Sequence, residues 1–186
     1  MPLALVQSRT VVFHPHHPYW SMHAAEEAGR IATVLADDFV TSEHIGATAV
    51  PSVSARAILD IVVIVKSLAA VDAAALSMVQ LGYTWRPDLK TENTRVCDLI
   101  SRRTGECVFR VTFAPAGSPE IERRVAFRDF LRTHPDEALT YNTVKIAASE
   151  EHPDDHGEYE SAKAEWMAAC ERRALAWRKS GVAANG

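Results

Sequence analysis

The feature that most constrains the fold is a nearly unbroken apolar run from Ala57 to Val65 that contains a single acid, Asp60. A short run so rich in Ile and Val predicts a strand that other elements cover on both faces. A lone carboxylate among such side chains costs desolvation free energy unless a partner compensates for it. Asp60 is therefore either a functional acid, as a metal ligand or general base, or an acid satisfied by backbone amides or by an arginine.

Other segments predict a mixed sheet around this strand. The last strand alternates, with Arg110 and Thr112 on one face and apolar side chains on the other. A glycine in the turn before it is typical of a hairpin. The predicted strands are Phe39 to Ile45, Ala57 to Val65, and the hairpin of Thr94 to Ser101 with Glu106 to Ala114, and Val11 to Phe13 is a short β-branched and aromatic run ahead of two prolines.

Apolar side chains at spacings of three and four predict helices that cover the sheet. The predicted helices are Tyr19 to Ala36, Leu68 to Leu81, Glu120 to Arg132, Asp136 to Ser149, and Tyr159 to about Lys179. In the second helix we place Leu68, Val71, Ala75 and Val79 on one buried side, and Thr133 is the expected cap of the fourth. The fold class is thus α+β (or α/β), with a mixed sheet and a helical C-terminal part.

Length and composition limit the organisation and the partners. The 186 residues predict a single domain over 1–186, with a frayed tail at 180–186. Hydrophobic residues make up 47%, charged residues 24%, and the net charge of −4 argues against a nucleic-acid partner. No segment has the apolar length of a membrane span, and three cysteines without paired spacing fit reduced thiols. We expect a cytoplasmic protein with a small-molecule substrate.

Several motifs resemble a known family. A small-residue turn followed by Asp60 on a buried strand resembles the core of the nucleotidyltransferase superfamily, in which two carboxylates follow a Gly-Ser turn. From about Val11 to Trp177 the chain is similar to the bacterial GrpB-like family of that superfamily. The landmarks are His17-Pro18-Tyr19-Trp20, Ile45-Gly46-Ala47-Thr48-Ala49-Val50-Pro51, Ile58-Leu59-Asp60-Ile61, Phe127-Arg128-Asp129-Phe130-Leu131-Arg132-Thr133-His134-Pro135, Tyr141 with Lys145, Tyr159 with Lys163, and Ala174 with Trp177.

The departures from this resemblance concern the metal site. Val62 stands where the superfamily has its second carboxylate, and Arg110-Val111-Thr112 stands where the family commonly has a His-Leu-His strand. Pro51-Ser52 replaces Pro-Gly, and Arg56-Ala57 replaces Lys-Pro. Two-metal phosphoryl transfer would have to recruit acids from elsewhere. The resemblance implies the fold of a phosphotransfer enzyme without its standard metal site.

The predicted site is a cleft beside the Gly46 turn. Asp60 is the expected general base or orienting acid, and Arg110 is expected to stabilise developing negative charge. Backbone amides of a small-residue turn after a strand can hold a phosphate, although Gly46 can equally serve only to make the turn. The expected ligand-binding residues are Gly46, Ala47, Thr48, Arg56, Thr112, Arg128, Lys145, Tyr159 and Lys163, with no metal ligands.

Several of these candidates have a purely structural alternative. Glu120, Arg124, Arg128 and Arg132 fall four apart and can form an exposed, self-paired charged face. Lys145, Tyr159 and Lys163 can be surface residues. A metal site among His14, His16, His17 and His23 is disfavoured, because no Cys or acid completes a tetrahedral set. Cys97 could act as a nucleophile only through neighbours brought close by the fold.

Three functions follow from these residues. We expect the cleft to bind a small anionic or phosphate-bearing ligand and to carry out a metal-independent transfer, ligation or cyclisation of a specialised small molecule. One alternative is a metal-dependent nucleotidyltransferase that uses a nucleotide and Mg²⁺. The other is a non-catalytic ligand-binding or protein-interaction module; an interaction protein would show an exposed apolar patch and no polar pocket.

Overall fold

The structure, a computed structural model, describes residues 12–184. Its centre is a five-stranded sheet in the order β1-β2-β5-β4-β3, in which β2 and β5 are parallel and the other neighbours are antiparallel. The strands are β1 (Phe39–Ile45), β2 (Leu59–Val65), β3 (Tyr83–Trp85), β4 (Arg95–Ile100) and β5 (Cys107–Pro115). The predicted mixed sheet is confirmed, and Asp60 lies on its second strand.

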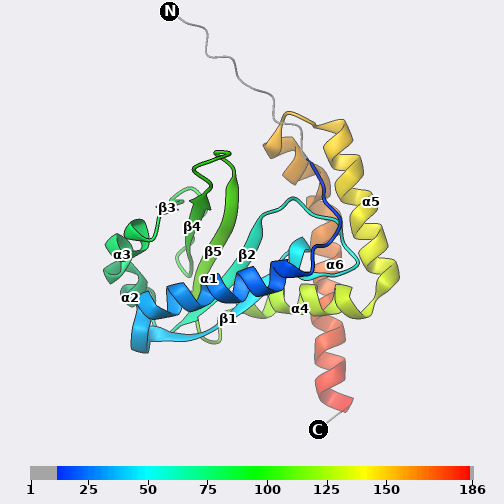
Figure 1. The fold of residues 1–186 in the computed structure, drawn as a ribbon. Coiled ribbons are helices and arrows are strands. Elements are labelled where there is room, and N and C mark those ends of the chain that lie inside the picture. The colour runs from blue at the N-terminus through cyan, green and yellow to red at the C-terminus, as the bar shows by residue number, and fades with distance from the viewer. Residues whose placement is uncertain (1–11, 185–186) are drawn as a thin grey trace, which may run out of the picture.

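Helices lie on both sides of this sheet, and Figure 1 shows α1 running across it while α4, α5 and α6 gather on one side. Helices α1, α2 and α3 pack on one face, and α4 packs on the other. The helices are α1 (Tyr19–Leu35), α2 (Leu68–Ala73), α3 (Ala75–Gln80), α4 (Pro119–Thr133), α5 (Pro135–Glu151) and α6 (His156–Ala184), with 3-10 turns η1 (Ala36–Asp38) and η2 (Ala47–Ala49). No described helix is long and apolar enough to cross a membrane.

The alternation along β5 divides the sheet into two chemically different faces. Val111 and Phe113 are fully buried in the core that α1, α2 and α3 cover. Arg110 and Thr112 point to the opposite face because successive side chains of a strand alternate. Strand pairing places Asp60 of β2 beside Arg110, so the polar side chains of the two strands meet on that second face.

The C-terminal helices form a second core that also holds the segment after β1. Val50 and Val53 pack among buried side chains of α4, α5 and α6. Tyr141 of α5 stacks on Trp166 of α6 with ring centroids 5.5 Å apart, and Phe127 of α4 meets the edge of Tyr141. The helices therefore fix the chain that follows the Gly46 turn, close to the polar face of the sheet.

The helix predicted over Leu68 to Leu81 is wrong as a single element. Ala74 has φ −83° and ψ 3°, which interrupts the helix between α2 and α3. The interruption turns the second piece, so Met78 is fully buried while Val79 is half exposed and Leu76 is largely exposed. Val79 therefore does not belong to the buried side that its spacing indicates.

The segment before α1, the start of α5 and the end of α6 show how the remaining sequence patterns fold. Val12 and Phe13 form no strand; only His14 pairs with Ala55, and Val11 lies outside the described residues. Pro15 and Pro18 lack the N–H that a longer ladder needs. Thr133 stays inside α4 and donates to the carbonyls of Asp129 and Phe130, so it does not cap α5. Helix α6 continues to Ala184, and the fraying predicted for 180–186 stays a prediction.

Candidate functional site

A cleft of about 400 Å³ lies between the polar face of the sheet and the C-terminal helices. We call it the cationic cleft, because six cationic side chains line it: Arg56, Arg110, Arg123, Arg124, Lys145 and Lys163. Asp60, Glu160 and Glu171 are the carboxylates in its lining. Of the residues predicted for the site, those that line the cleft are Gly46, Ala47, Thr48, Arg56, Asp60, Arg110, Thr112, Lys145, Tyr159 and Lys163.

Asp60 lies against the Gly46 turn at the end of β1. Gly46 has φ +75°, and a Cβ added there would lie 2.7 Å from Asp60 Oδ2. Only glycine allows both this backbone conformation and this close approach. The Gly46 turn therefore accommodates the Asp60 carboxylate at close range. Gly46 does more than make a tight turn, because a larger residue there would meet this carboxylate.

The Asp60 carboxylate accepts no hydrogen bond from any side chain or backbone amide in the part of the chain that the structure describes. Burial raises the pKa of Asp60, against the attraction of Arg110, Arg124, Arg56 and Lys163. The amides of the turn therefore do not satisfy the acid, and Arg110 acts on it through charge and not through a hydrogen bond. Whether Asp60 is structural or functional stays a prediction. Asp60 is left as an unpaired acid within a basic cleft.

Arg110 is held by a partner that the sequence did not single out. Its Nε and Nη2 donate to the two carboxylate oxygens of Asp98 on β4, at 2.8 and 2.9 Å. Arg86 donates to the same carboxylate at 2.6 Å. Burial alone would raise the pKa of Asp98, but these arginines lower it. The predicted hairpin could have indicated this partner, because its two strands place Asp98 opposite Arg110.

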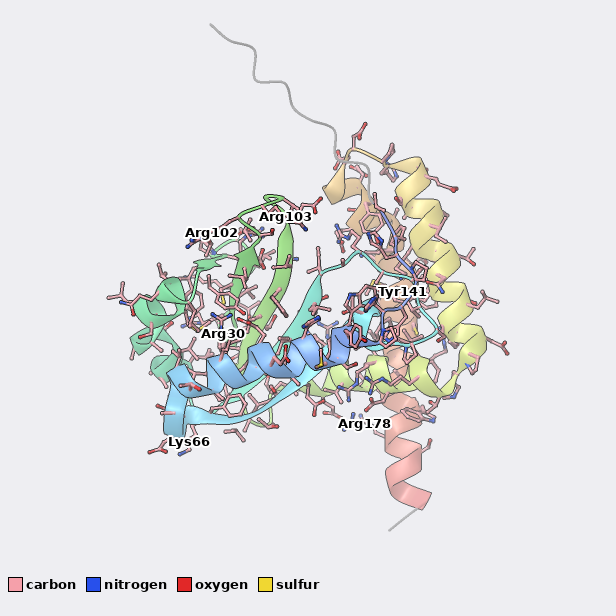
Figure 2. All side chains as sticks on the ribbon, viewed as in Figure 1. Arg30, Lys66, Arg102, Arg103, Tyr141 and Arg178 are labelled. Atoms are coloured by element: carbon pink, nitrogen blue, oxygen red, sulfur yellow. The ribbon has the colours of Figure 1, made fainter. Side chains whose placement is uncertain are left out.

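Lys145 of α5 is a buried amine, and its side chain lines the cleft. Its Nζ donates to the carbonyl of Ser54 and lies 4.5 Å from the ring centroid of Tyr141. Burial, followed by the charges of Lys163 and Arg56, lowers the pKa of Lys145 to about 7. Among residues 12–184, no carboxylate forms an ion pair with Lys145. Figure 2 shows Tyr141 inside the molecule, whereas Lys66 and Arg178 lie at its edge.

Lys163 and Arg56 flank the ring of Tyr159. Lys163 Nζ lies 4.4 Å from the ring centroid and the Arg56 guanidinium lies 5.3 Å from it. Glu160 accepts from Lys163 at 2.9 Å and lies 3.6 Å from Arg56. Burial lowers the pKa of Lys163 in spite of Glu160. Lys145, Tyr159 and Lys163 are only 2%, 1% and 7% exposed, so the alternative of surface residues is wrong.

Arg123 and Arg124 enter the cleft from α4 and were not among the predicted site residues. Both donate to Glu120, and Arg123 also pairs with Glu171 of α6. The Arg124–Glu120 ion pair is the self-pairing expected for this face of the helix. The face was expected to be exposed, however, and this pair is half-buried in the cleft. Helical spacing alone could not show that the sheet would lie opposite these side chains.

Arg128 does not line the cationic cleft, so its predicted role as a ligand-binding residue has no support from this cleft. Its guanidinium is buried and donates to Glu43, to the carbonyl of His44 and to the adjacent Asp129. Glu43 and His44 belong to β1, so these two contacts fix α4 to β1. The Phe-Arg-Asp-Phe-Leu-Arg motif is therefore explained at this position by helix packing.

The donors in the cleft do not fit a two-metal site. Asp60 is paired in register with Arg110, the position that a second carboxylate would take on β2 is Val62, and Val62 is itself buried. Within 12–184, no group of three His, Cys, Asp or Glu side chains is arranged to hold a metal ion. Divalent cations such as Mg²⁺ prefer several oxygen ligands, and the surrounding arginines and lysines would repel a cation.

Comparison with known proteins places this fold among solved structures. GrpB from Enterococcus faecalis superposes with a TM-score of 0.82 at 28% identity, covering 90% of this chain and 99% of that one. The Cid1 poly(U) polymerase with Mg 3'-dATP bound gives a TM-score of 0.53 at 10% identity, over 80% of this chain and 49% of that one. The second likeness is one of fold alone, and it identifies the sheet and helices as a nucleotidyltransferase fold.

Sequence relatives lead to a more specific assignment. UPF0157 protein YqkA of Bacillus subtilis is 30% identical over 182 residues, which cover 98% of this chain and 52% of that protein. A dephospho-CoA kinase of Mycobacterium leprae is 27% identical, over 89% of this chain and 46% of the kinase. The chain thus spans about half the length of these relatives. The family model described as GrpB protein matches residues 10–173, and the chain therefore belongs to the GrpB family.

Proposed function

We propose that the cationic cleft binds a small anionic or phosphate-bearing ligand and that Asp60 acts on it, or on its reaction partner, as a general base or orienting acid. The observation that carries the proposal is the set formed by Lys145, Lys163 and Arg56. These three cations are at least partly buried and repel one another, and Glu160 pairs with Arg56 and Lys163 but not with Lys145.

The charge balance explains why an anion fits this wall. A buried cation without a countercharge is unfavourable, which is why the pKa of Lys145 is lowered to about 7. An anion between Lys145 and Lys163 would supply the missing countercharge and return the proton to Lys145. Arg110, Arg123 and Arg124 already have carboxylate partners, so they are preorganised and need no rearrangement on binding.

The chemistry that suits these groups is a transfer, ligation or cyclisation that needs no metal. The raised pKa of Asp60 brings the acid closer to neutral pH, where a general acid or base works best. Arg110, held rigidly by Asp98, could stabilise negative charge that develops beside Asp60. The fold of Cid1 and the similarity to dephospho-CoA kinases make nucleotides and coenzyme A precursors the first ligands to test.

Calorimetric titration tests the binding step. The probes are inorganic phosphate, AMP, ATP and dephospho-CoA, each with a chelator present. Lys163→Met should weaken any phosphate-bearing probe by about tenfold or more, since one charged contact is lost. Lys66→Met is the matched control because Lys66 is exposed and does not line the cleft, and it should change the affinity by less than about twofold. No binding at millimolar concentration, or equal losses in both variants, would refute the proposal.

A second experiment separates the three functional alternatives once a bound substrate is known. Asp60→Asn should reduce turnover by about a hundredfold or more with little change on adding a chelator. Activity that disappears with chelator would restore the metal-dependent nucleotidyltransferase. Binding without any turnover in wild-type protein would instead support a non-catalytic ligand-binding module.

A further inference from the structure

A second cavity of about 420 Å³ opens beside the cationic cleft. Its lining includes five uncharged polar side chains, and we call it the hydroxyl lobe after them: Thr91, Asn93, Thr94, Thr112 and Ser118. Leu89, Val96, Thr112, Arg123 and Arg124 line both cavities, so the two adjoin at β5 and the first turns of α4. A ligand can therefore extend from one cavity into the other.

The hydroxyl lobe differs from the cationic cleft in charge. Its two cations, Arg123 and Arg124, both donate to Glu120, which also lines the lobe, and Arg123 pairs in addition with Glu171. Lys145 of the cationic cleft is a buried cation that forms no ion pair with a carboxylate of the described chain. The lining of the hydroxyl lobe contains no cation of this kind. It consequently lacks the excess positive charge that would select an anion.

Hydrogen-bonding capacity in the lobe is only partly used. Thr112 Oγ1, at the junction, makes no hydrogen bond with the described residues, and Ser118 Oγ is buried without a partner among them. The Thr91 and Thr94 hydroxyls share one hydrogen bond of 2.9 Å, and they accept from the amides of Asn93 and Thr91, respectively. The hydroxyl that donates the shared bond keeps one lone pair, and the other keeps its O–H. Hydroxyl and amide groups that both donate and accept are suited to the alcohol groups of a sugar.

We propose that the hydroxyl lobe binds an uncharged, hydroxyl-rich group, such as the sugar of a nucleoside, next to an anionic group held in the cationic cleft. This inference rests on the proposed function for the position of the anionic group, and it names the class of the adjoining group. It makes Thr112 the point where the two parts of the ligand, or two substrates, meet. Thr112 lies in register with Val62, and this pair is two residues along the strands from the Asp60–Arg110 pair, on the same face of the sheet.

Saturation-transfer NMR with adenosine and uridine, in the presence of phosphate, tests the lobe with uncharged probes. Asn93→Trp places a large ring in the lobe at an exposed position, and Glu92→Trp is the matched control at the neighbouring exposed position outside the lining. Asn93→Trp should weaken nucleoside binding by about tenfold or more, while Glu92→Trp should change it by less than about twofold. Thr112→Val, which keeps the shape but removes the hydroxyl, should also weaken it.

The outcomes separate this inference from the proposed function. Nucleoside binding that Asn93→Trp abolishes, together with phosphate that fails to bind, would uphold the lobe and refute the anion site. Phosphate binding that depends on Lys163, with no nucleoside bound at about 10 mM, would uphold the anion site and overturn the lobe. Equal losses in Asn93→Trp and Glu92→Trp would also overturn it.

Discussion

The two faces of the sheet are made by the same strands but have opposite chemistry. On the face under α1, α2 and α3, Ile61, Val111 and Phe113 are fully buried among apolar neighbours. On the other face, Asp60 and Arg110 meet in a cleft that the C-terminal helices only partly close. One face thus contributes apolar burial and stability, while the other holds charges at a cost in stability. The comparison predicts that substitutions one residue apart will affect different properties.

The largest effect should come from Phe113→Ala on the apolar face. Removing this fully buried ring leaves a cavity and should lower the free energy of unfolding by about 3–5 kcal/mol. Urea denaturation measures the loss. Its neighbour Thr112 supplies the comparison, because Thr112→Val should change stability by less than about 1 kcal/mol and act on ligand binding instead. A similar loss of stability in both variants would contradict the division between the faces.

Gly46→Ala tests how closely the turn fits the carboxylate. The variant combines a positive φ with a Cβ 2.7 Å from Asp60 Oδ2, so it should destabilise the fold by about 1–3 kcal/mol. In an Asp60→Ala background the clash is removed and only the backbone strain remains. The cost of Gly46→Ala should therefore be smaller there, and a double-mutant cycle by thermal denaturation measures the difference. An unchanged cost would show that the carboxylate does not limit the turn.

Much of the fold could be predicted from the sequence, because local patterns specify it. The apolar run around Asp60 identified β2, and the alternation around Arg110 gave both β5 and the face on which it meets Asp60. The three-residue strand β3 was missed because so short a segment carries no period. The break at Ala74 was missed because nothing in the local residue types requires it.

The candidate site was predictable only where the residues resemble a family motif. Asp98, Arg123 and Glu171 were missed because their positions depend on strands and helices distant in sequence. Arg128 shows the opposite error, since it lies in a family motif yet its guanidinium binds Glu43 and the carbonyl of His44. A motif shows that a residue matters to the fold or the site, and only the tertiary contacts tell which.

The pH dependence of anion binding should sharpen the contrast between the cleft and the apolar face. Sulfate is a suitable probe because its own charge is constant near neutral pH. Lys145, whose pKa burial lowers to about 7, is charged below that pH and neutral above it. Sulfate affinity should therefore fall about tenfold as the pH rises from about 6 to about 8. Calorimetry on Lys145→Met should show weaker binding and a flatter profile, whereas Lys66→Met should keep the slope.

The smallest effect is expected from Asp60→Asn. Its sign distinguishes the two faces, because this substitution should raise stability whereas Phe113→Ala lowers it. Burial raises the pKa of Asp60 in the folded state above its unfolded value of about 3.9, so the acid stabilises the fold only when protonated. That contribution is present below about pH 4 and is lost as the pH rises through the raised pKa. The neutral amide avoids the loss, so Asp60→Asn should be more stable than wild type at about pH 7 and no more stable at about pH 4. Urea denaturation at both pH values measures the difference. If Asp60→Asn is instead less stable than wild type at neutral pH, the surrounding cations stabilise the charged carboxylate. Asp60 would then contribute to the stability of the fold, as the residues of the apolar face do.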